Sequence, residues 1–168
     1  MRRIRESVVW QLAVLALGAA PSVHAQLASS DPDWKEMDSP VPPAYSIERM
    51  IPVDVQSAGL KFGIDPSTLS VDADGVVRYV IVARSATGAR TALFEGIRCA
   101  TGQVRTYARK NADESWSPVR DGDWRSLRDG QRSVHAHAAA RQGLCVGNST
   151  PWNTREIVRA LNNPAYDK

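Results

Sequence analysis

The feature that most restricts the fold is the run VVRYVIVAR, which extends from Val76 to Arg84 directly after the turn sequence Asp72-Ala73-Asp74-Gly75. The run is rich in β-branched residues, and its middle is apolar on both faces. Such a composition is typical of a strand that is covered on both sides. An Asp-Gly pair before a strand favours a tight hairpin turn. The sequence therefore predicts a central strand over 76–84, entered through a hairpin.

Further strands are predicted on both sides of this run. They are short apolar stretches separated by Gly-containing turns, and their ranges are 53–55, 60–64, 67–71, 90–99 and 103–110. Trp116 begins a short edge strand after the last of them. Strands that follow one another through short turns pair as antiparallel neighbours. We therefore expect a meander of four to five antiparallel strands.

The last third of the chain changes to a helical pattern. An Ala-rich segment over 131–142 predicts a helix with Gly143 as its C-terminal cap. Its expected core positions are Val134, Ala138 and Leu144. A second helix is predicted over 154–161, capped by Asn153 or Thr154. Strands first and helices afterwards predict an α+β fold, an antiparallel β-meander packed by two C-terminal helices.

The first 25 residues have the pattern of a secretory signal peptide. Three arginines lie among the first five residues, an uncharged run extends from Val8 to Ala20, and Val23-His24-Ala25 resembles a peptidase site. The apolar run rises only about 20 Å as a helix, too short for a hydrocarbon core of about 30 Å. We expect a Sec-type signal, cleavage after Ala25, a periplasmic product and no stable membrane span after cleavage. The alternatives are an uncleaved anchor or a buried helix.

Residues 26–44 are polar and contain several prolines, which disfavour both helix and strand. This composition predicts a flexible arm, with Trp34 as an anchor onto the folded body. The chain has 168 residues, and the remainder, 45–168, has the ordinary size of one domain. We therefore expect a single α+β domain after the arm.

Cys99 and Cys145 are the two cysteines of the chain. Two cysteines in an exported protein usually pair, because the compartment is oxidising. A bridge would close a loop of about 47 residues, worth about 4 kcal/mol in the loop-entropy treatment. The sequence predicts a structural disulfide. Two free thiols or a redox pair are the alternatives, although redox pairs generally have C-x-x-C spacing.

Several short segments carry a resemblance to a known family. They are DGVVRY from Asp74 to Tyr79, FEGIRC from Phe94 to Cys99, Tyr107-Ala108, Trp116, Trp124 and Leu144-Cys145. With them the chain resembles the cryptic neisserial protein-like (CNP1-like) family of small exported proteobacterial proteins, from about Trp34 to Leu161. Phe94 stands where Tyr is expected in that family. The resemblance implies a Gram-negative periplasmic setting and a shared fold. It implies no catalytic residues, because the family has no established activity.

Four polar side chains on the predicted strands 90–99 and 103–110 are candidate ligand-facing residues: Glu95, Arg98, Arg105 and Tyr107. A turn at 100–102 would place Ile97 opposite Arg105 and Glu95 near Tyr107, with Arg98 on the other face. Guanidinium groups bind anions through forked hydrogen bonds, so the cluster could hold an anionic or peptide ligand. The alternative is a cross-strand ion pair on a solvated face.

No catalytic residue, metal site or cofactor is predicted. His135 and His137 lie two apart on a helix and point away from each other, so we interpret them as surface histidines. The segment 72–75 lacks the later ligands of a calcium loop. The chain has no G-x-S-x-G, Walker A or Rossmann glycine motif. A triad assembled only in space stays open, so enzyme activity is uncertain and less favoured. Trp116, Trp124 and Trp152 are expected at the core or its edge, or else stacked on sugar or peptide rings.

Charge divides the chain into two parts. Residues 26–77 carry three basic and nine acidic groups, a balance of −6, whereas 78–168 carry fifteen basic and eight acidic groups, a balance of +7. An exported protein seldom meets nucleic acid, so we expect an envelope protein or an anionic envelope component as partner. We therefore expect a non-enzymatic periplasmic binding module. A periplasmic hydrolase and a structural accessory of envelope assembly are the alternatives.

Overall fold

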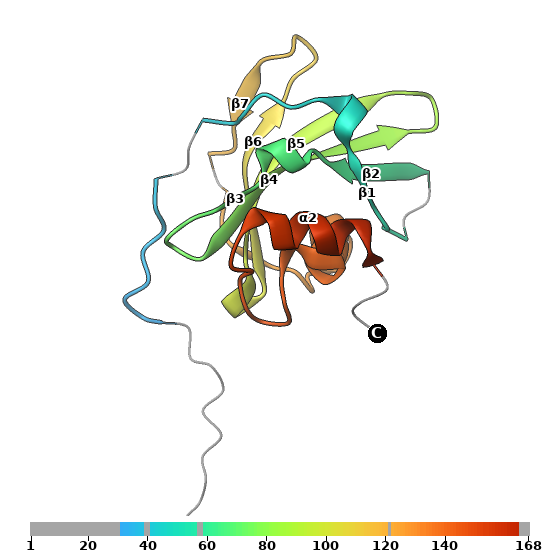
Figure 1. Ribbon diagram of the computed structural model, residues 1–168. Helices are drawn as coiled ribbons and strands as arrows, with labels where there is room; N and C mark the ends of the chain where they lie inside the picture. Colours follow the sequence, from blue (N-terminus) through green and yellow to red (C-terminus); the bar gives the residue numbers. More distant parts are fainter. Residues whose placement is uncertain (1–30, 39–40, 57–58, 121, 165–168) are drawn as a thin grey trace, which may run out of the picture.

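The computed structural model describes residues 31–38, 41–56, 59–120 and 122–164 (Figure 1). The predicted signal peptide and its cleavage site after Ala25 lie outside these residues. The strands are β1 Ile51–Val53, β2 Leu60–Ile64, β3 Ser70–Val71, β4 Val76–Ser85, β5 Arg90–Arg98, β6 Gln103–Lys110, β7 Trp116–Pro118 and β8 Arg125–Ser126. The helical elements are the 3₁₀ turns η1 Ile47–Arg49, η2 Pro66–Thr68, η3 Cys99–Thr101 and η4 Gly130–Arg132, the π turn η5 Ala140–Leu144, and helices α1 Val134–Ala139 and α2 Thr154–Asn162.

All strands belong to one antiparallel sheet with the order β1-β2-β4-β5-β6-β7, in which β3 also pairs with β4 and β8 also pairs with β6. The predicted α+β class with two C-terminal helices is confirmed. The predicted number of strands was too low, because the sheet has eight in the part of the chain described here. The strand with no counterpart among the predicted ranges is β8, and a segment of two residues carries little periodic signal. Within the described ranges, no helix has the length and apolar character needed to cross a membrane.

The strand predicted over 67–71 is shorter than expected because a tight turn occupies its first half. The Asp65 side chain accepts hydrogen bonds from the backbone N–H and the hydroxyl of Ser67, and this caps the turn η2. Pro66 suits the first position of such a turn because its N–H is not needed there. β2 and β3 therefore lie end to end along β4, separated by η2.

Both faces of β4 are buried, as the sequence predicted. Val77, Tyr79 and Ile81 belong to the core beneath the helices, where α2 contributes Ile157 and Leu161. Val80 and Val82 belong to a second, smaller core on the other face, against which Tyr45 and Met50 pack. Figure 1 shows the strands between α2 and the segment that leads into β1. The sheet is therefore the middle layer between the helices and the N-terminal segment.

The first C-terminal helix differs from the prediction. Instead of one helix over 131–142, α1 is followed by the π turn η5, and the fully buried positions are Ala136, Ala139, Ala140 and Leu144. The expected core residues Val134 and Ala138 are only half-buried. Gly143 ends the helix with φ of 151°, and a Cβ there would lie 2.5 Å from Ala160 Cβ. The chain turns early because glycine allows η5 to approach α2 this closely.

The predicted disulfide is present between Cys99 and Cys145, whose Cα atoms are 5.6 Å apart. Cys99 opens η3 at the end of β5, and Cys145 follows η5 directly. The bridge therefore fastens the helical layer to one end of the sheet. Asn153 caps α2, with its side-chain oxygen accepting from the Glu156 N–H at 3.1 Å.

Candidate functional site

The structure separates Glu95 from the other three candidate ligand-facing residues, Arg98, Arg105 and Tyr107, which all contact the segment 31–38. β5 and β6 pair Ile97 with Val104, Gly96 with Arg105 and Glu95 with Thr106, so the predicted pairing of Ile97 with Arg105 was wrong by one residue. When the pairing register of a strand shifts by one residue, each of its side chains moves to the other face of the sheet relative to the partner strand. The reason is the connection: η3 and Gly102, with φ of 60°, make a turn that closes on Arg98 and Gln103.

Glu95 lies on the helix-facing side and is completely buried, against the expectation of a solvated surface. Its carboxylate accepts hydrogen bonds from the Tyr79 and Thr106 hydroxyls, each at 3.0 Å. Nε2 of His135 lies 3.1 Å from Glu95 Oε2, and the His135 ring stacks on Phe62 with centroids 5.5 Å apart. The interpretation of His135 as a surface residue was therefore wrong, since its side chain is only 12% exposed.

The electrostatics of this cluster favour an ionised carboxylate. Burial raises the pKa of Glu95, but the hydrogen bonds from His135, Thr106 and Tyr79 outweigh it and hold that pKa below its usual value. Burial and the neighbouring Glu95 charge together raise the pKa of Tyr79 well above its usual value. Because the Glu95 carboxylate has no exposed surface and lies next to His135 of α1, the cluster connects α1 to the sheet.

Arg105 and Tyr107 point to the other face and bind Glu36 of the N-terminal segment. Glu36 Oε2 accepts from Arg105 Nη1 at 2.5 Å and from Trp124 Nε1 at 3.1 Å. Glu36 Oε1 accepts from the Tyr107 hydroxyl at 2.6 Å and lies 3.7 Å from Arg78 Nη2. Three side chains thus donate hydrogen bonds to Glu36 and Arg78 forms an ion pair with it; we call these four residues, Arg78, Arg105, Tyr107 and Trp124, the carboxylate clasp. Burial and then the bond to Glu36 raise the pKa of Tyr107, which keeps its hydroxyl protonated as a donor.

Two local devices give the clasp its shape. The register between β5 and β6 shifts by one residue between Phe94 and Glu95, and the extra residue on β6 is Tyr107. Gly96 lies beneath the phenol, where a Cβ would come within 2.6 Å of the Tyr107 hydroxyl and 2.8 Å of Val76 Cγ1. The glycine of the E-G-I-R-C segment is therefore required by the close approach of the tyrosine.

Arg78 is the most buried member of the clasp, with a side chain that is 1% exposed. It donates to Asp72 Oδ2 at 2.7 Å and to Asp74 Oδ2 at 2.8 Å. Although burial opposes the charge, Asp74 and then Asp72 raise the pKa of Arg78. Burial likewise opposes the charge of Asp74, yet the bond from Arg78 lowers its pKa. The two aspartates of the D-x-D-G sequence therefore bind a buried arginine. This role accounts for their spacing without a calcium loop.

Arg98 contacts the same N-terminal segment through an aromatic ring. Its guanidinium lies 3.8 Å from the centre of the Trp34 ring, and Trp34 Nε1 donates to the Asp74 carbonyl at 2.8 Å. Trp34 also meets Trp124 edge to face at 5.9 Å. The prediction of Trp34 as an anchor is confirmed.

The other tryptophans divide between buried and exposed positions. Trp116 is half-buried and meets Tyr45 edge to face at 6.1 Å, so it lies at the core edge as expected. Trp124 is likewise half-buried within the clasp. Trp152 is 92% exposed, and the expectation that it packs at the core was wrong. It lies just before the N-cap of α2, and the apolar positions that reach the core, Ile157 and Leu161, come only later.

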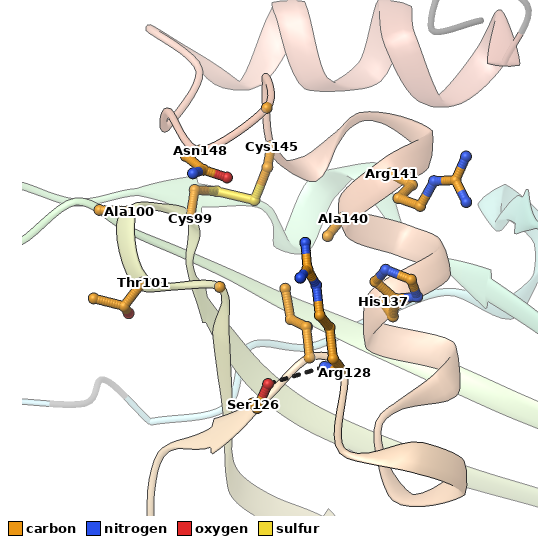
Figure 2. A pocket seen from close by; sticks show the side chains of 13 residues that line it. Cys99, Ala100, Thr101, Ser126, Arg128, His137, Ala140, Arg141, Cys145 and Asn148 are labelled. Carbon is orange, nitrogen blue, oxygen red and sulfur yellow. Dashed lines mark hydrogen bonds between the residues drawn. A yellow bond between two sulfur atoms is a disulfide. The ribbon is translucent and has the colours of Figure 1, made fainter. Parts of the chain in front are cut away.

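A cavity of about 800 Å³ lies beside the disulfide (Figure 2). It is bounded by η3, by the loop after β8, by α1 with η5, and by the residues that follow Cys145. The basic side chains that line it are Arg128, His137 and Arg141, and no carboxylate is found among its described lining residues. Figure 2 shows the Arg128 side chain extending toward the disulfide, while its backbone N–H donates to Ser126 Oγ at 3.1 Å.

This cavity was not predicted from the sequence. His137 and Arg141 are four positions apart on the helical segment of α1 and η5, but only tertiary packing brings Arg128 to them. The feature of the sequence that pointed toward a basic site was the excess of positive charge over 78–168. Two guanidinium groups and an imidazole can bind an anion through charge-assisted hydrogen bonds. The cavity is not lined by any of the residues whose pKa values are shifted, which are Asp65, Asp74, Arg78, Tyr79, Glu95, Tyr107 and Asp113. Across the described residues, no group of three His, Cys, Asp or Glu side chains could hold a metal ion.

The protein is therefore a disulfide-linked α+β domain with a basic cavity and with a carboxylate clasp that binds its own N-terminal segment. The chain belongs to the CNP1-like family, whose pattern it matches over residues 29–162. Neither the curated proteins nor the solved structures contain a match.

Proposed function

We propose that this CNP1-like protein is a periplasmic, non-enzymatic binding protein that holds an anionic envelope component in the cavity beside the disulfide. The observation that carries the proposal is that Arg128, Arg141 and His137 all line one cavity, with no carboxylate among its described lining residues. In the described chain, no acidic partner lies within salt-bridge distance of either arginine. Asp129 follows Arg128 but does not line the cavity. Their charge is therefore available to a ligand.

Binding is favoured over catalysis by the distribution of polar groups. An active site usually combines a pocket with residues whose pKa values are shifted for proton transfer. Here the shifted groups lie in internal ion pairs and hydrogen bonds: Glu95 in the cluster with His135, and Asp74 and Tyr107 around the N-terminal segment. The cavity instead offers permanent positive charge, which suits the recognition of phosphate or carboxylate groups.

The periplasmic location rests on the N-terminal pattern and is supported by the disulfide, since such bonds persist in oxidising compartments. The test is expression of the full chain in a Gram-negative host, followed by fractionation and N-terminal sequencing. We expect the periplasmic product to begin at Gln26. Retention of Met1 on a cytoplasmic product would contradict the proposed location.

Isothermal titration calorimetry with inorganic pyrophosphate tests the proposed ligand class. We expect saturable binding that weakens as salt is added, because the attraction is electrostatic. The combined substitution Arg128→Gln and Arg141→Gln should abolish it. Arg159→Gln is the matched control, since Arg159 is an exposed arginine of α2 that does not line the cavity.

The outcomes separate the candidate functions. Binding that survives the double substitution, or no binding at all, contradicts the assignment of the cavity and favours the structural accessory role. Consumption of pyrophosphate during the titration, measured as released phosphate, would favour the hydrolase.

A further inference from the structure

The carboxylate clasp has the organisation of a recognition site and is separate from the basic cavity. Its residues come from three places: Arg78 on β4, Arg105 and Tyr107 on β6, and Trp124 before β8. They converge on one carboxylate, that of Glu36, whose side chain is 14% exposed. Arg78 is held by Asp72 and Asp74, so the position of this guanidinium does not depend on Glu36. Preorganised donors of this kind bind anions with little loss of entropy.

The clasp offers more donors than its present occupant uses. Among the described residues, Nε of Arg78 and Nε of Arg105 are buried and have no hydrogen-bond partner. Buried guanidinium N–H groups without acceptors cost free energy. A segment that presents a second acceptor beside its carboxylate would satisfy them better than Glu36 alone does.

The occupant itself is held by side chains and not by strand pairing. Residues 31–38 form no strand. Their contacts with the sheet are the Glu36 bonds, the Trp34 contacts with Arg98 and Asp74, and bonds of the Met37 backbone with Asp74 and Arg78. Recognition by two anchors two residues apart, an aromatic ring and a carboxylate, is the mode of a short linear peptide. The same anchors on another chain would make the same contacts.

We infer that the clasp, together with Arg98 and Trp124 where they contact the Trp34 ring, forms a binding site for an acidic peptide segment of a partner protein. The segment carries an aromatic residue two positions before a carboxylate, as Trp34 and Glu36 do. The N-terminal segment occupies the site in cis and competes with the partner. This site is independent of the anion cavity, so either assignment can fail without the other.

Fluorescence anisotropy of a labelled peptide with the sequence of residues 31–38, DPDWKEMD, tests the inference. The receptor is the protein carrying Trp34→Ala and Glu36→Ala, which empties the site in cis. We expect saturable binding to this variant. Binding to the wild-type protein should be at least tenfold weaker, because the tethered segment competes at an effective concentration on the order of millimolar.

Two matched controls assign the binding to the clasp. A peptide with Glu36→Gln should bind about tenfold to a hundredfold more weakly, as expected for the loss of charge-assisted hydrogen bonds. Adding Arg105→Gln to the receptor should weaken the unaltered peptide by a similar factor. Adding Arg159→Gln, on the distant helix α2, should leave the affinity unchanged.

Circular dichroism establishes that each receptor variant is folded. If the double variant does not fold, the single substitution Glu36→Gln serves as receptor, because it retains Trp34 and the size of the side chain. A folded receptor that shows no saturable binding overturns the inference. Binding that is indifferent to Arg105→Gln and to the Glu36→Gln peptide overturns it as well.

Discussion

Nε2 of His135 lies 3.1 Å from Oε2 of Glu95, and this contact joins the first turn of α1 to the middle of the sheet. Glu95 also accepts hydrogen bonds from the hydroxyls of Tyr79 and Thr106, which lie on the strands on either side of β5. A buried carboxylate with three partners holds three strands and a helix in one arrangement. The contact therefore contributes to the specificity of packing as well as to stability.

Replacing Glu95 by Gln should destabilise the fold by about 2 kcal/mol, because hydrogen bonds to a charged acceptor become neutral ones and the amide cannot accept from every donor. Urea denaturation followed by circular dichroism measures the change. Glu48→Gln is the control, since Glu48 is exposed and should shift stability by less than about 0.5 kcal/mol. Equal effects of the two substitutions would contradict the role of Glu95.

Stability should fall in acid, and Glu95 should account for part of the loss. Despite burial, its hydrogen bonds hold the pKa of Glu95 below the usual 4.5, so the unfolded chain takes up the proton first as the pH falls. The contribution is complete above about pH 4.5 and is lost as the pH falls through the folded-state pKa. The pKa values of Asp65 and Asp74 are also lowered, because hydrogen bonds and neighbouring arginines outweigh burial, and act in the same direction.

Melting temperatures recorded from neutral pH downward check this dependence. The decline below about pH 4.5 should be shallower for Glu95→Gln than for the wild-type protein. Glu48→Gln should follow the wild-type curve. A slope that is unchanged in Glu95→Gln would show that Glu95 has the same pKa in the folded and unfolded chains.

Reduction of the disulfide should cost about 4 kcal/mol, the value for closing a loop of this length in the unfolded chain. The bridge spans 46 positions and fastens η5 to the β5–β6 turn. The measurement is urea denaturation with and without reductant, together with the double substitution Cys99→Ser and Cys145→Ser. A thiol count on the unreduced, denatured protein is the companion check, and two free thiols would refute the bridge.

Gly96→Ala should disturb the carboxylate clasp from below. A Cβ at this position would lie 2.6 Å from the Tyr107 hydroxyl and 2.8 Å from Val76 Cγ1, so we expect a loss of about 1–3 kcal/mol from overpacking. Tyr107→Phe removes only the hydroxyl bond to Glu36 and should cost less, about 1 kcal/mol. Thermal denaturation ranks the two variants, and the reverse order would contradict the packing argument.

The strands with long apolar or alternating runs were predictable from sequence. β2 and β6 were predicted with their observed ends, and β4 and β5 to within one residue, because their patterns repeat over five or more positions. The turn at Asp72–Gly75 and the end of the helical segment of α1 and η5 near Gly143 were also predictable, since glycine has positive φ at both. β3 and α1 were shorter than predicted, because the η2 and η5 turns replace part of each.

The candidate site was less predictable because it depends on register. Glu95 and Tyr107 were expected to be neighbours, yet the turn at η3 and the extra residue on β6 send them to opposite faces. Neither device changes the local apolar pattern, so neither can be read from one strand alone.

The sequence by itself determined the elements, the α+β class and the presence of two cysteines able to pair, because these follow from local periodicity and composition. Tertiary structure alone decided that Glu95 is buried against His135, that Glu36 occupies the clasp, and that Arg128, His137 and Arg141 share a cavity. The physical reason is distance along the chain: Glu36 and Arg105 are 69 positions apart, and contacts between such residues follow only from how the layers pack.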